Sequence, residues 1–469
     1  MIAVIIFYFV VLFAISRWAA RRASNETFFR GNRQSPWYMV AFGMVGASIS
    51  GITLVSVPGM VMTSQMAYLQ LCIGFILGYV FIAFVLLPVY YRLNVASIYA
   101  YLGERLGPTA HLTGSWFFLL SKMTGAALRF YVVCLVLQQF VFGPMGWPFW
   151  LTAVALVLLI WLYTRRGGIR TLVFTDTFQT FCLLVALLLI IYMVIRGLGY
   201  SVGEAVSAVA ADEHSRIFVL DDWRSPQNLW KQLVSGAFIV IVMTGLDQDM
   251  MQKNLTCKTL REAQKDMCSY GVAFVPVNLL FLALGVLLLQ YFAQAGIAIP
   301  QKGDELMPLA VEHFGMWVGV PFVIGIVAAS FSSADSALTS LTTIFCVDIC
   351  RRQDDERLRK YVHLGMCVVF VGFILAFRIL NNTSLIDAIY TLVGYTYGPL
   401  LGLFAFGLLT KRRPRGSWVP VVCVASPLLC YALSTIAKQQ FDYQFGYELL
   451  LMNGLLTFIG CLAGSARPR

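Results

Sequence analysis

Apolar residues occupy nearly every position in runs of about 20 residues that recur from the start of the chain to its end. Residues 75–91, FILGYVFIAFVLLPVYY, are typical of these runs because they would be apolar on every face of a helix. Strands of a membrane barrel would instead alternate apolar and polar residues at every second position. The pattern therefore predicts an all-α polytopic membrane protein.

Thirteen runs are long enough to cross the hydrocarbon core of a bilayer as helices. They lie at residues 1–20, 37–66, 68–91, 112–142, 147–164, 171–195, 229–250, 267–293, 316–346, 361–379, 385–410, 417–437 and 447–464. Because the connecting segments are short, we expect one membrane domain over residues 1–469 rather than a separate soluble domain. An odd number of spans places the two termini on opposite sides of the membrane.

Basic residues are distributed unevenly among the connecting segments. The loops that follow odd-numbered spans carry most of the 34 Lys and Arg residues, with clusters at 165–166, 351–360 and 411–415. By the positive-inside rule, this asymmetry predicts an external amino terminus and a cytoplasmic carboxyl terminus. The short loops favour a multi-pass protein of a plasma (inner) membrane. The net charge of +11 is scattered over short loops, which excludes a nucleic-acid partner.

Composition excludes other classes of protein. Hydrophobic residues make up 59% of the chain and charged residues 12%, which is not the composition of a soluble domain. The 11 Cys residues lie mostly within or beside apolar runs without metal-ligand spacing, and the four His residues are dispersed. We therefore expect no disulfides, no zinc site and no enzymatic activity.

The run at 321–347 contains the polar segment AASFSSADSALTS at residues 328–340. An aspartate near the middle of a membrane costs roughly 2.5–3.5 kcal/mol on the insertion scale, so Asp335 needs a partner. Helical spacing places most of the polar side chains on one face: Ser332, Ser333, Asp335, Ser336, Thr339 and Ser340. This stripe indicates a site for an alkali cation; the alternative is a hydroxyl-rich helix interface in which Asp335 pairs with a buried arginine.

The run at 37–66 is interrupted by several Gly, Ser and Pro residues. Unwound backbone at membrane depth is tolerated only beside a cavity or within protein. At a rise of about 1.5 Å per residue from Trp37, residues 46–51 lie roughly 14–21 Å along the span, near the bilayer centre. Freed carbonyl groups there can bind a cation, and the half-helix ends can face a solute. A small-residue packing seam is the alternative, which explains the glycines but not the hydroxyl groups of Ser48, Ser50 and Thr53.

Three charged residues in or beside apolar runs indicate further polar contacts. Asp176 lies in the inner half of the run at 171–195. Asp247 lies at the cytoplasmic end of its run, where it either contacts a solute or belongs to an ordinary solvated helix end. Arg129, deep in the run at 112–142, is either a ligand for an anion or the ion-pair partner of Asp335 or Asp176.

Four motifs resemble those of the sodium/solute symporter family, whose members include sodium-coupled sugar, proline, sialic acid and iodide carriers. They are RGNRQSPW at 30–37, GGIRTLVFTDTFQ at 167–179, Asp247-Gln248 with KTLREA at 258–263, and SSADSAL at 332–338 leading to Asp348. The resemblance covers nearly the whole chain. It implies the leucine-transporter-type fold, with inverted five-helix repeats at 37–195 and 229–410, one extra amino-terminal helix at 1–20 and two carboxyl-terminal helices at 417–464.

The resemblance also implies Na⁺ as the coupling ion. Carried onto matching positions, the first sodium site consists of the backbone carbonyls of Gly46, Ile49 and Ala329 and the side chains of Ser332 and Ser333. A possible second sodium ion would share Ser332 and bind Asp176, Asp335 and Ser336. Asp335 departs from the family at a position that is often serine.

The solute of the family lies between the broken segment and its neighbours, which nominates Ser48, Ser50, Thr53, Gln70 and Asp247. Arg129 resembles the residue with which sialic acid carriers bind the substrate carboxylate, so we expect import of an organic anion such as a sialic acid by alternating access. If Arg129 instead neutralises an aspartate, a neutral sugar or polyol is expected. A transporter-like membrane sensor is the alternative from another class. The expected partners are the small organic solute, sodium ions and the lipid bilayer, and the oligomeric state stays open.

Overall fold

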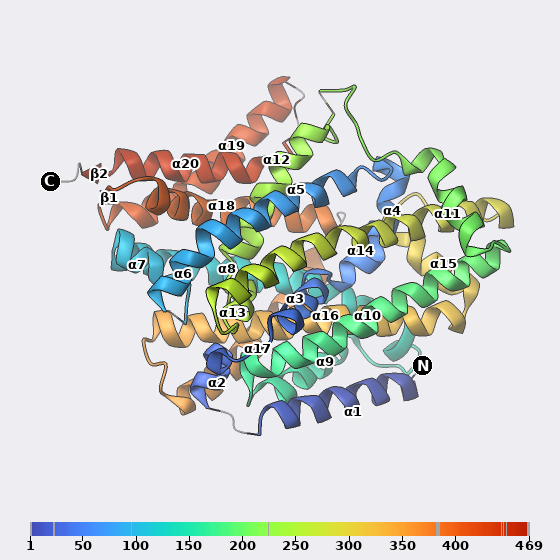
Figure 1. Ribbon diagram of the computed structural model, residues 1–469, viewed down its shortest axis with the longest axis horizontal. Coiled ribbons are helices and arrows are strands. Elements are labelled where there is room, and N and C mark those ends of the chain that lie inside the picture. Colours follow the sequence, from blue (N-terminus) through green and yellow to red (C-terminus); the bar gives the residue numbers. More distant parts are fainter. Residues whose placement is uncertain are drawn as a thin grey trace.

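The chain is almost entirely helical in the computed structural model (Figure 1). The structure describes residues 2–466 except 22, 23, 95, 224, 381–384, 442, 444 and 447; the side chains of residues 2, 380, 385–393, 441 and 466 also lie outside this description.

The helices of the first half of the chain are α1 (Ile2–Ala19), α2 (Asn25–Arg30), α3 (Trp37–Ser48), α4 (Gly51–Ser64), α5 (Tyr68–Phe81), α6 (Leu87–Leu93), α7 (Ala100–Leu106), α8 (Pro108–Leu137), α9 (Phe149–Thr164), α10 (Gly168–Leu198) and α11 (Val202–Ala211). Those of the second half are α12 (Leu229–Val240), α13 (Gln248–Asn254), α14 (Leu260–Ala295), α15 (Leu306–Phe314), α16 (Met316–Ile344), α17 (Glu356–Leu380), α18 (Leu385–Leu409), α19 (Trp418–Phe441) and α20 (Leu449–Ala463).

Shorter elements complete the chain. Turns of π-helix extend α5, α8, α12 and α16 at Ile82–Leu86, Gln138–Phe142, Ile241–Gly245 and Phe345–Ile349. Turns of 3₁₀-helix lie at Gly31–Arg33, Glu213–Ser215 and Gly303–Glu305. Strands β1 (Arg413–Pro414) and β2 (Ser465–Ala466) pair antiparallel, which fixes the end of α20 to the loop between α18 and α19.

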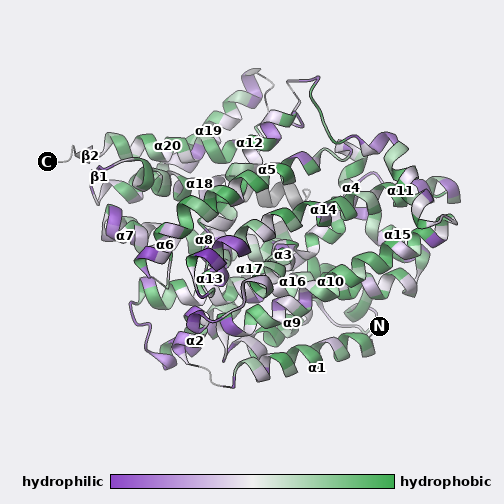
Figure 2. Ribbon diagram, viewed as in Figure 1, coloured by the Kyte–Doolittle hydropathy of each residue, from purple (hydrophilic) through white to green (hydrophobic). Residues whose placement is uncertain are grey.

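Seven of the described helices are long and apolar enough to cross a membrane, and two bent helix pairs raise the number to nine if each pair is one span. Figure 2 shows apolar residues along most helices and hydrophilic residues gathered at α13 and α2. The predicted helical, multi-pass architecture is confirmed. The other four predicted runs coincide with the shorter apolar helices α1, α9, α18 and α20, so thirteen crossings stay a prediction.

Each bent pair begins one of the two predicted five-helix repeats. Helices α3 and α4 meet at 63°, and the segment Leu229–Gly245 meets α13 at 72°. At the first break, Ile49 (ψ 91°) and Ser50 (ψ 168°) are extended, so α3 ends and α4 starts afresh at Gly51. At the second break, Asp247 is extended (ψ 118°) and its side chain accepts a hydrogen bond from the Asp249 amide, which caps α13.

Two glycines allow other helices to approach the first break closely. A Cβ atom at Gly46 would lie 2.0 Å from Oγ1 of Thr180 on α10, and one at Gly51 would lie 2.2 Å from Oγ of Ser330 on α16. Both separations are far below van der Waals contact. The glycines therefore bring α10 and α16 against the unwound backbone.

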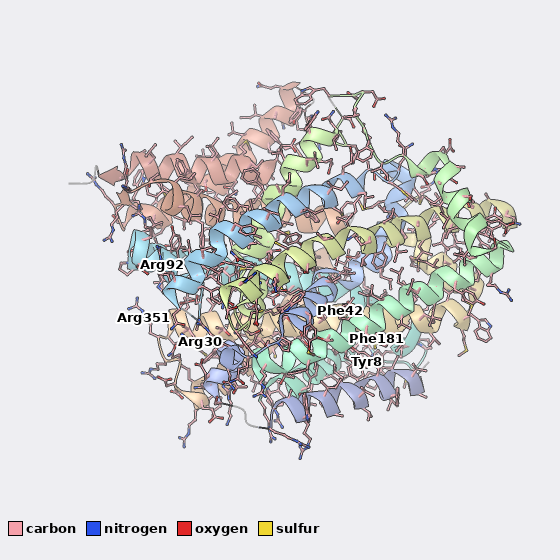
Figure 3. All side chains as sticks on the ribbon, viewed as in Figure 1. Tyr8, Arg30, Phe42, Arg92, Phe181 and Arg351 are labelled. Atoms are coloured by element: carbon pink, nitrogen blue, oxygen red, sulfur yellow. The ribbon has the colours of Figure 1, made fainter. Side chains whose placement is uncertain are left out.

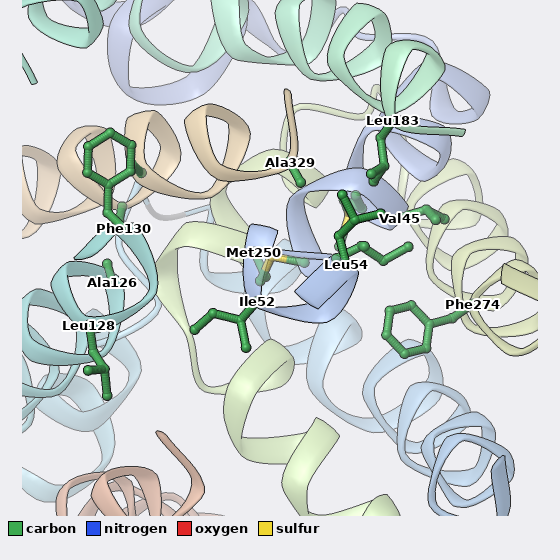
Figure 4. Packing of buried hydrophobic residues seen from close by; sticks show 14 of the residues in the cluster. Val45, Ile52, Leu54, Ala126, Leu128, Phe130, Leu183, Met250, Phe274 and Ala329 are labelled. Atoms are coloured by element: carbon green, nitrogen blue, oxygen red, sulfur yellow. The ribbon is translucent and has the colours of Figure 1, made fainter. Parts of the chain in front are cut away.

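Helix α16 lies within the protein, where it contacts α10, α8, α4 and α3. Figure 4 shows Ala329 of α16 beside Val45 and Leu54 of the broken pair, with Leu183 of α10 and Phe274 of α14 nearby. All five side chains are buried. The polar residues of α16 from Ser332 to Ser340 are also mostly buried, as are Ile49 and Ser50 at the break. Protein rather than lipid thus surrounds both, as broken backbone at membrane depth requires.

Arginines from three of the basic loops lie toward the same end of the molecule, as the labels for Arg30, Arg92 and Arg351 show (Figure 3). The Arg30 guanidinium donates a hydrogen bond to the carbonyl of Asn94 at 3.1 Å, which joins the loops after the first and third predicted spans. This grouping matches the sequence assignment of these loops to one side of the membrane.

Candidate functional site

The two helix breaks face a common cavity of about 140 Å³ in the interior of the bundle. Its wall comes from both broken pairs and from α5, α8, α14, α16 and α18. The polar residues in this wall include Ser48, Ser50, Thr53, Lys122, Arg129, Thr244, Asp247, Asp249, Tyr270, Ser333 and Tyr397. Five of the six residues predicted to bind solute therefore meet at one cavity, although they come from three separate parts of the sequence.

Arg129 of α8 lines this cavity and is half-buried. No Asp or Glu of the described residues lies within ion-pair distance of its guanidinium. The alternative in which Arg129 pairs with Asp335 or Asp176 is wrong, because Asp335 accepts a hydrogen bond from Tyr163 and Asp176 pairs with Lys253. A guanidinium without an acidic partner can donate to an anion in the cavity.

Asp247 forms the acidic part of the cavity wall and is only 2% exposed, so it is not a solvated helix end. The Lys122 ammonium lies 3.0 Å from Asp247 Oδ2 and 2.7 Å from Asp249 Oδ2. The Tyr397 hydroxyl of α18 donates a hydrogen bond of 2.8 Å to the same Asp247 carboxylate. This cluster joins α8, α13 and α18, and two buried carboxylates share the single ammonium group of Lys122.

Two hydroxyl groups from α5 and α14 continue the wall beside the first break. Tyr79 donates to Tyr270 at 2.7 Å, and Tyr270 forms a short hydrogen bond with Ser48. Ser50 and Thr53 line the cavity two and five residues further along the chain. The predicted solute contacts of Ser48, Ser50 and Thr53 are thus geometrically available.

Gln70 does not line the cavity, in contrast to the prediction. Its amide nitrogen donates to the carbonyls of Ala67 and Gln227, and its amide oxygen accepts from the Val219 amide at 3.1 Å. These bonds fix the long loop between α11 and α12 to the start of α5. Gln70 is a polar residue on α5, a helix that also lines the cavity with other residues. The sequence alone therefore did not distinguish this structural role from solute binding.

The predicted first sodium site lies where α16 crosses the end of α3. The Ser333 hydroxyl donates to the carbonyl of Ala47 at 2.9 Å and to that of Ala329 at 3.1 Å. The last hydrogen bond of α3 joins the Ile49 amide to the Val45 carbonyl, so the carbonyls of residues 46–49 lie beyond the regular helix. Oxygen atoms of both elements therefore meet here, as hard-oxygen coordination of an alkali cation requires.

The residues predicted for a second sodium ion gather one helical turn further along α16. The Ser332 hydroxyl donates to Asp176 Oδ1 at 2.8 Å, and Asp335 accepts hydrogen bonds from the Tyr163 hydroxyl at 2.6 Å and from Ser336 at 3.2 Å. The structure also brings the Lys253 ammonium within 2.8 Å of Asp176 Oδ2. Lys253 follows the run at 229–250, so the predicted spans place it in a cytoplasmic loop, whereas it is only 1% exposed.

Sequence reasoning therefore missed five residues of these clusters: Lys122, Tyr163, Asp249, Lys253 and Tyr397. One signal was present for the first of them, because Lys122 is a charged residue within an apolar run. The two tyrosines stand in apolar runs without a distinguishing pattern.

Comparison with known proteins relates these features to carriers. The pattern of the family described as "Sodium:solute symporter family" matches residues 28–416. The sodium/sialic acid symporter NanT of Aliivibrio fischeri is 25% identical over 468 residues, which cover 96% of this chain and 91% of that protein. The human sodium/iodide cotransporter is 24% identical over 403 residues, which cover 82% of this chain but 61% of that longer protein.

Two solved structures share the fold. A substrate-bound, outward-open Na⁺-coupled sialic acid symporter superimposes with a TM-score of 0.84 at 20% identity, covering 99% of this chain and 98% of that one. The nucleobase-cation-symport-1 transporter Mhp1 superimposes with a TM-score of 0.59 at 14% identity, covering 93% of each chain. At these identities the likeness concerns the fold alone.

Proposed function

Because the chain belongs to the sodium:solute symporter family, we propose that it imports a small organic anion together with sodium by alternating access. Members of this family are transporters rather than enzymes. The observation that carries the proposal is Arg129, whose guanidinium faces the cavity without an acidic partner among the described residues.

Charge in the cavity wall favours an anionic solute. The two basic residues of this wall differ, since Lys122 pairs with Asp247 and Asp249, whereas Arg129 has no acidic partner in the part of the chain that the structure describes. The planar guanidinium fork matches the two oxygens of a carboxylate and binds them bidentately. Relatives named as sialic acid symporters make a sialic acid our favoured anion, and Arg129 is the residue that the family resemblance nominates for its carboxylate.

Hydroxyl groups in the same wall would bind the rest of the solute. Ser48, Ser50 and Thr53 supply donors and acceptors from the first break, in the same wall as the Asp247 cluster. This composition also suits a neutral sugar or polyol, which is the second candidate. A sialic acid, with a carboxylate and several hydroxyl groups, would use both sets of contacts.

For the coupling ion, we propose the first sodium site as predicted: the carbonyls of Gly46, Ile49 and Ala329 and the hydroxyls of Ser332 and Ser333. The contact of Ser333 with the end of α3 supports this assignment. A sodium ion there would hold the first break against α16 and preorganise the adjoining cavity for solute. Each sodium ion that enters across a potential of 100 mV contributes about 2.3 kcal/mol to uptake.

The topology we propose has thirteen crossings in a plasma membrane, with the amino terminus outside and the carboxyl terminus in the cytoplasm. Within it, the repeats span 37–195 and 229–410, flanked by the helices at 1–20 and 417–464. The two bent pairs at the start of the repeats and the grouping of basic loops at one end support this arrangement.

The test is uptake of labelled solutes into proteoliposomes that contain the purified chain. A panel of sialic acid, short monocarboxylates and neutral sugars is offered with an inward sodium gradient and with an equal potassium gradient. We expect sodium-dependent uptake of a carboxylate. Uptake of neutral sugars alone would favour the second candidate, and absence of solute counterflow for the whole panel would favour a sensor.

Arg129→Gln tests the anion contact directly. Loss of charge-assisted hydrogen bonds worth about 1.5–3 kcal/mol is expected to weaken apparent affinity for the carboxylate roughly 10- to 150-fold. Arg196→Gln, at an exposed position in the last turn of α10, is the control for loss of an arginine. Unchanged affinity in Arg129→Gln would contradict the assignment.

A further inference from the structure

The end of α13 and the second turn of α14 enclose a carboxyl group that belongs to neither the solute cavity nor the sodium sites. Asp266 of α14 and Asn254, the last residue of α13, are both fully buried. The side-chain amide of Asn254 donates to Asp266 Oδ2 at 2.5 Å and to the carbonyl of Ala263 at 3.0 Å. One side chain thus joins the two helices across the turn at 255–259.

Asp266 is buried without a counter-ion. No Lys, Arg or His nitrogen in the described part of the chain lies within ion-pair distance of its carboxyl oxygens. The ionisable side chains around it are acids: Tyr91 of α6, Cys257 of the turn, and Glu262 and Cys268 of α14. The basic side chains of adjoining segments make other contacts: Lys253 with Asp176, Lys265 with the ring of Trp37, and Arg33 with the ring of Tyr91. An ionised carboxylate here would be an uncompensated buried charge, which proteins avoid by keeping the group neutral.

Two oxygen atoms without partners indicate where the neutralising proton lies. Asp266 Oδ1 and Asn254 Oδ1 are both buried, and neither has a hydrogen-bond partner among the described residues. The orientation of the Asn254 amide is fixed, because its nitrogen faces two acceptors. A carboxylic acid and a carboxamide can pair through two hydrogen bonds, one from N–H to the acid and one from O–H to the amide oxygen. The first of these bonds is present, and a proton on Asp266 Oδ1 supplies the donor for the second.

This pair lies toward the end of the molecule where the basic loops gather. The Tyr91 hydroxyl donates to the carbonyls of Asn254 at 3.4 Å and Cys257 at 3.1 Å, and the next residue, Arg92, is labelled at that end in Figure 3. At its other end, α13 contributes Asp249 to the cavity wall. Helix α13 therefore connects the acid–amide pair with the cavity.

We propose that Asp266 is a proton-binding site, whose carboxyl holds a proton in this conformation and pairs with Asn254 as a neutral acid. When α13 separates from α14, water reaches the carboxyl and its O–H bond breaks. The electron pair stays on Oδ1, and the proton passes to water on the predicted cytoplasmic side. Acid on that side therefore stabilises the contact of α13 with α14, and alkali weakens it. This inference goes beyond sodium-coupled transport and does not depend on it.

Infrared spectroscopy of the purified, full-length chain in detergent at pH 7 tests for the proton. A protonated carboxyl group has a C=O stretching band that is separate from the bands of carboxylates and amides. We expect Asp266→Asn, a nearly isosteric change, to fold and to remove part of this band. The control Asp354→Asn, at an exposed loop position, should leave the band unchanged because that carboxyl is ionised at pH 7.

Two results of this experiment would overturn the proposal. An unchanged carboxyl band in Asp266→Asn would mean that Asp266 is ionised in the native chain. Failure of Asp266→Asn to fold would mean that the negative charge is required, since a neutral group of the same shape replaces a neutral acid without leaving an unpaired charge.

Hydrogen exchange at residues 248–254, followed by mass spectrometry, tests whether the proton holds α13 in place. If opening of α13 releases one proton, each pH unit raises the opening equilibrium constant by up to about tenfold. Asp266→Asn has no proton to release, and comparison with it at each pH cancels the pH dependence of exchange itself. From pH 6 to pH 8, we expect exchange in the native chain to rise about 10- to 100-fold relative to this variant. A ratio that does not change with pH would overturn the role of the proton, and because sodium and solute are omitted, it would leave the proposed transport function untouched.

Discussion

Replacement of Lys122 by Met tests whether the charged cluster holds the cavity wall together. The ammonium contacts Asp247 at 3.0 Å and Asp249 at 2.7 Å, and the three side chains are 9%, 3% and 6% exposed. Met keeps the length and apolar stem of the side chain but removes the charge. Two buried carboxylates would then lose their closest cation.

The structure sets the size of the expected effect. Breaking a buried ion pair by removal of one partner typically costs 3–5 kcal/mol of folding free energy. Two remaining contacts reduce this loss of folding free energy, because Tyr397 still donates to Asp247 and Lys253 lies 3.9 Å from Asp249. We therefore expect Lys122→Met to lower the free energy of unfolding by about 3 kcal/mol, the lower end of that range.

A double variant separates charge from packing. In Lys122→Met/Asp247→Asn, the carboxylate that depends most on Lys122 is neutral, while Asp249 retains Lys253. More than half of the lost stability should return, so that the two substitutions are strongly non-additive.

Reversible unfolding in mixed detergent micelles, followed by tryptophan fluorescence, measures these free energies. Lys302→Met, at an exposed loop position, is the matched control and should stay within about 0.5 kcal/mol of the native value. A loss of less than about 1 kcal/mol in Lys122→Met, or additive losses in the double variant, would refute the idea of a stabilising buried cluster.

Two further predictions concern the first break. Ser333→Ala removes the hydroxyl that contacts the end of α3, so we expect the sodium concentration for half-maximal uptake to rise about tenfold, or about 1.4 kcal/mol, with normal protein abundance. Ser340→Ala, at a buried position on the same helix, is the control. An equal loss of protein abundance and sodium affinity in Ser333→Ala would mean that the hydroxyl has a structural role. Gly46→Ala places a Cβ atom against Thr180 and should destabilise the chain by about 1–3 kcal/mol. In the control Gly372→Ala, in α17, the added Cβ meets no atom within 4 Å and should not lower stability. Equal thermal stability of the two variants would contradict this packing argument.

The helical architecture could be predicted because the bilayer dictates it. Spanning backbone must satisfy its hydrogen bonds internally, so apolar runs of about 20 residues become helices whatever their neighbours are. The interruption of the run at 37–66 was visible for the same reason, since Gly, Ser and Pro at mid-membrane have no place in an uninterrupted helix. The break lies at Ile49 and Ser50, inside the predicted interval 46–51.

Part of the site could also be predicted. Arg129 and the serines of α16 stand in apolar runs, where each polar group is costly and so marks a contact. The structure places Arg129 and Ser333 in the cavity wall, with Ser48, Ser50, Thr53 and Asp247. Gln70 is likewise a polar residue in an apolar run, but it forms hydrogen bonds to a loop and does not line the cavity.

Sequence alone thus determined the fold class, the position of the first break and which polar residues lie at membrane depth. Tertiary structure alone decided which of them are neighbours: Lys122 with Asp247, Lys253 with Asp176, and Tyr163 with Asp335. The two members of these pairs are separated by 125, 77 and 172 positions in the chain. The residue pattern along one helix shows which of its faces is polar, but it does not show which residue of a distant helix packs against that face. The bend of 72° before α13 is decisive, because it turns a segment predicted to be a cytoplasmic loop back into the protein interior. Lys253 is thereby buried against Asp176 of α10.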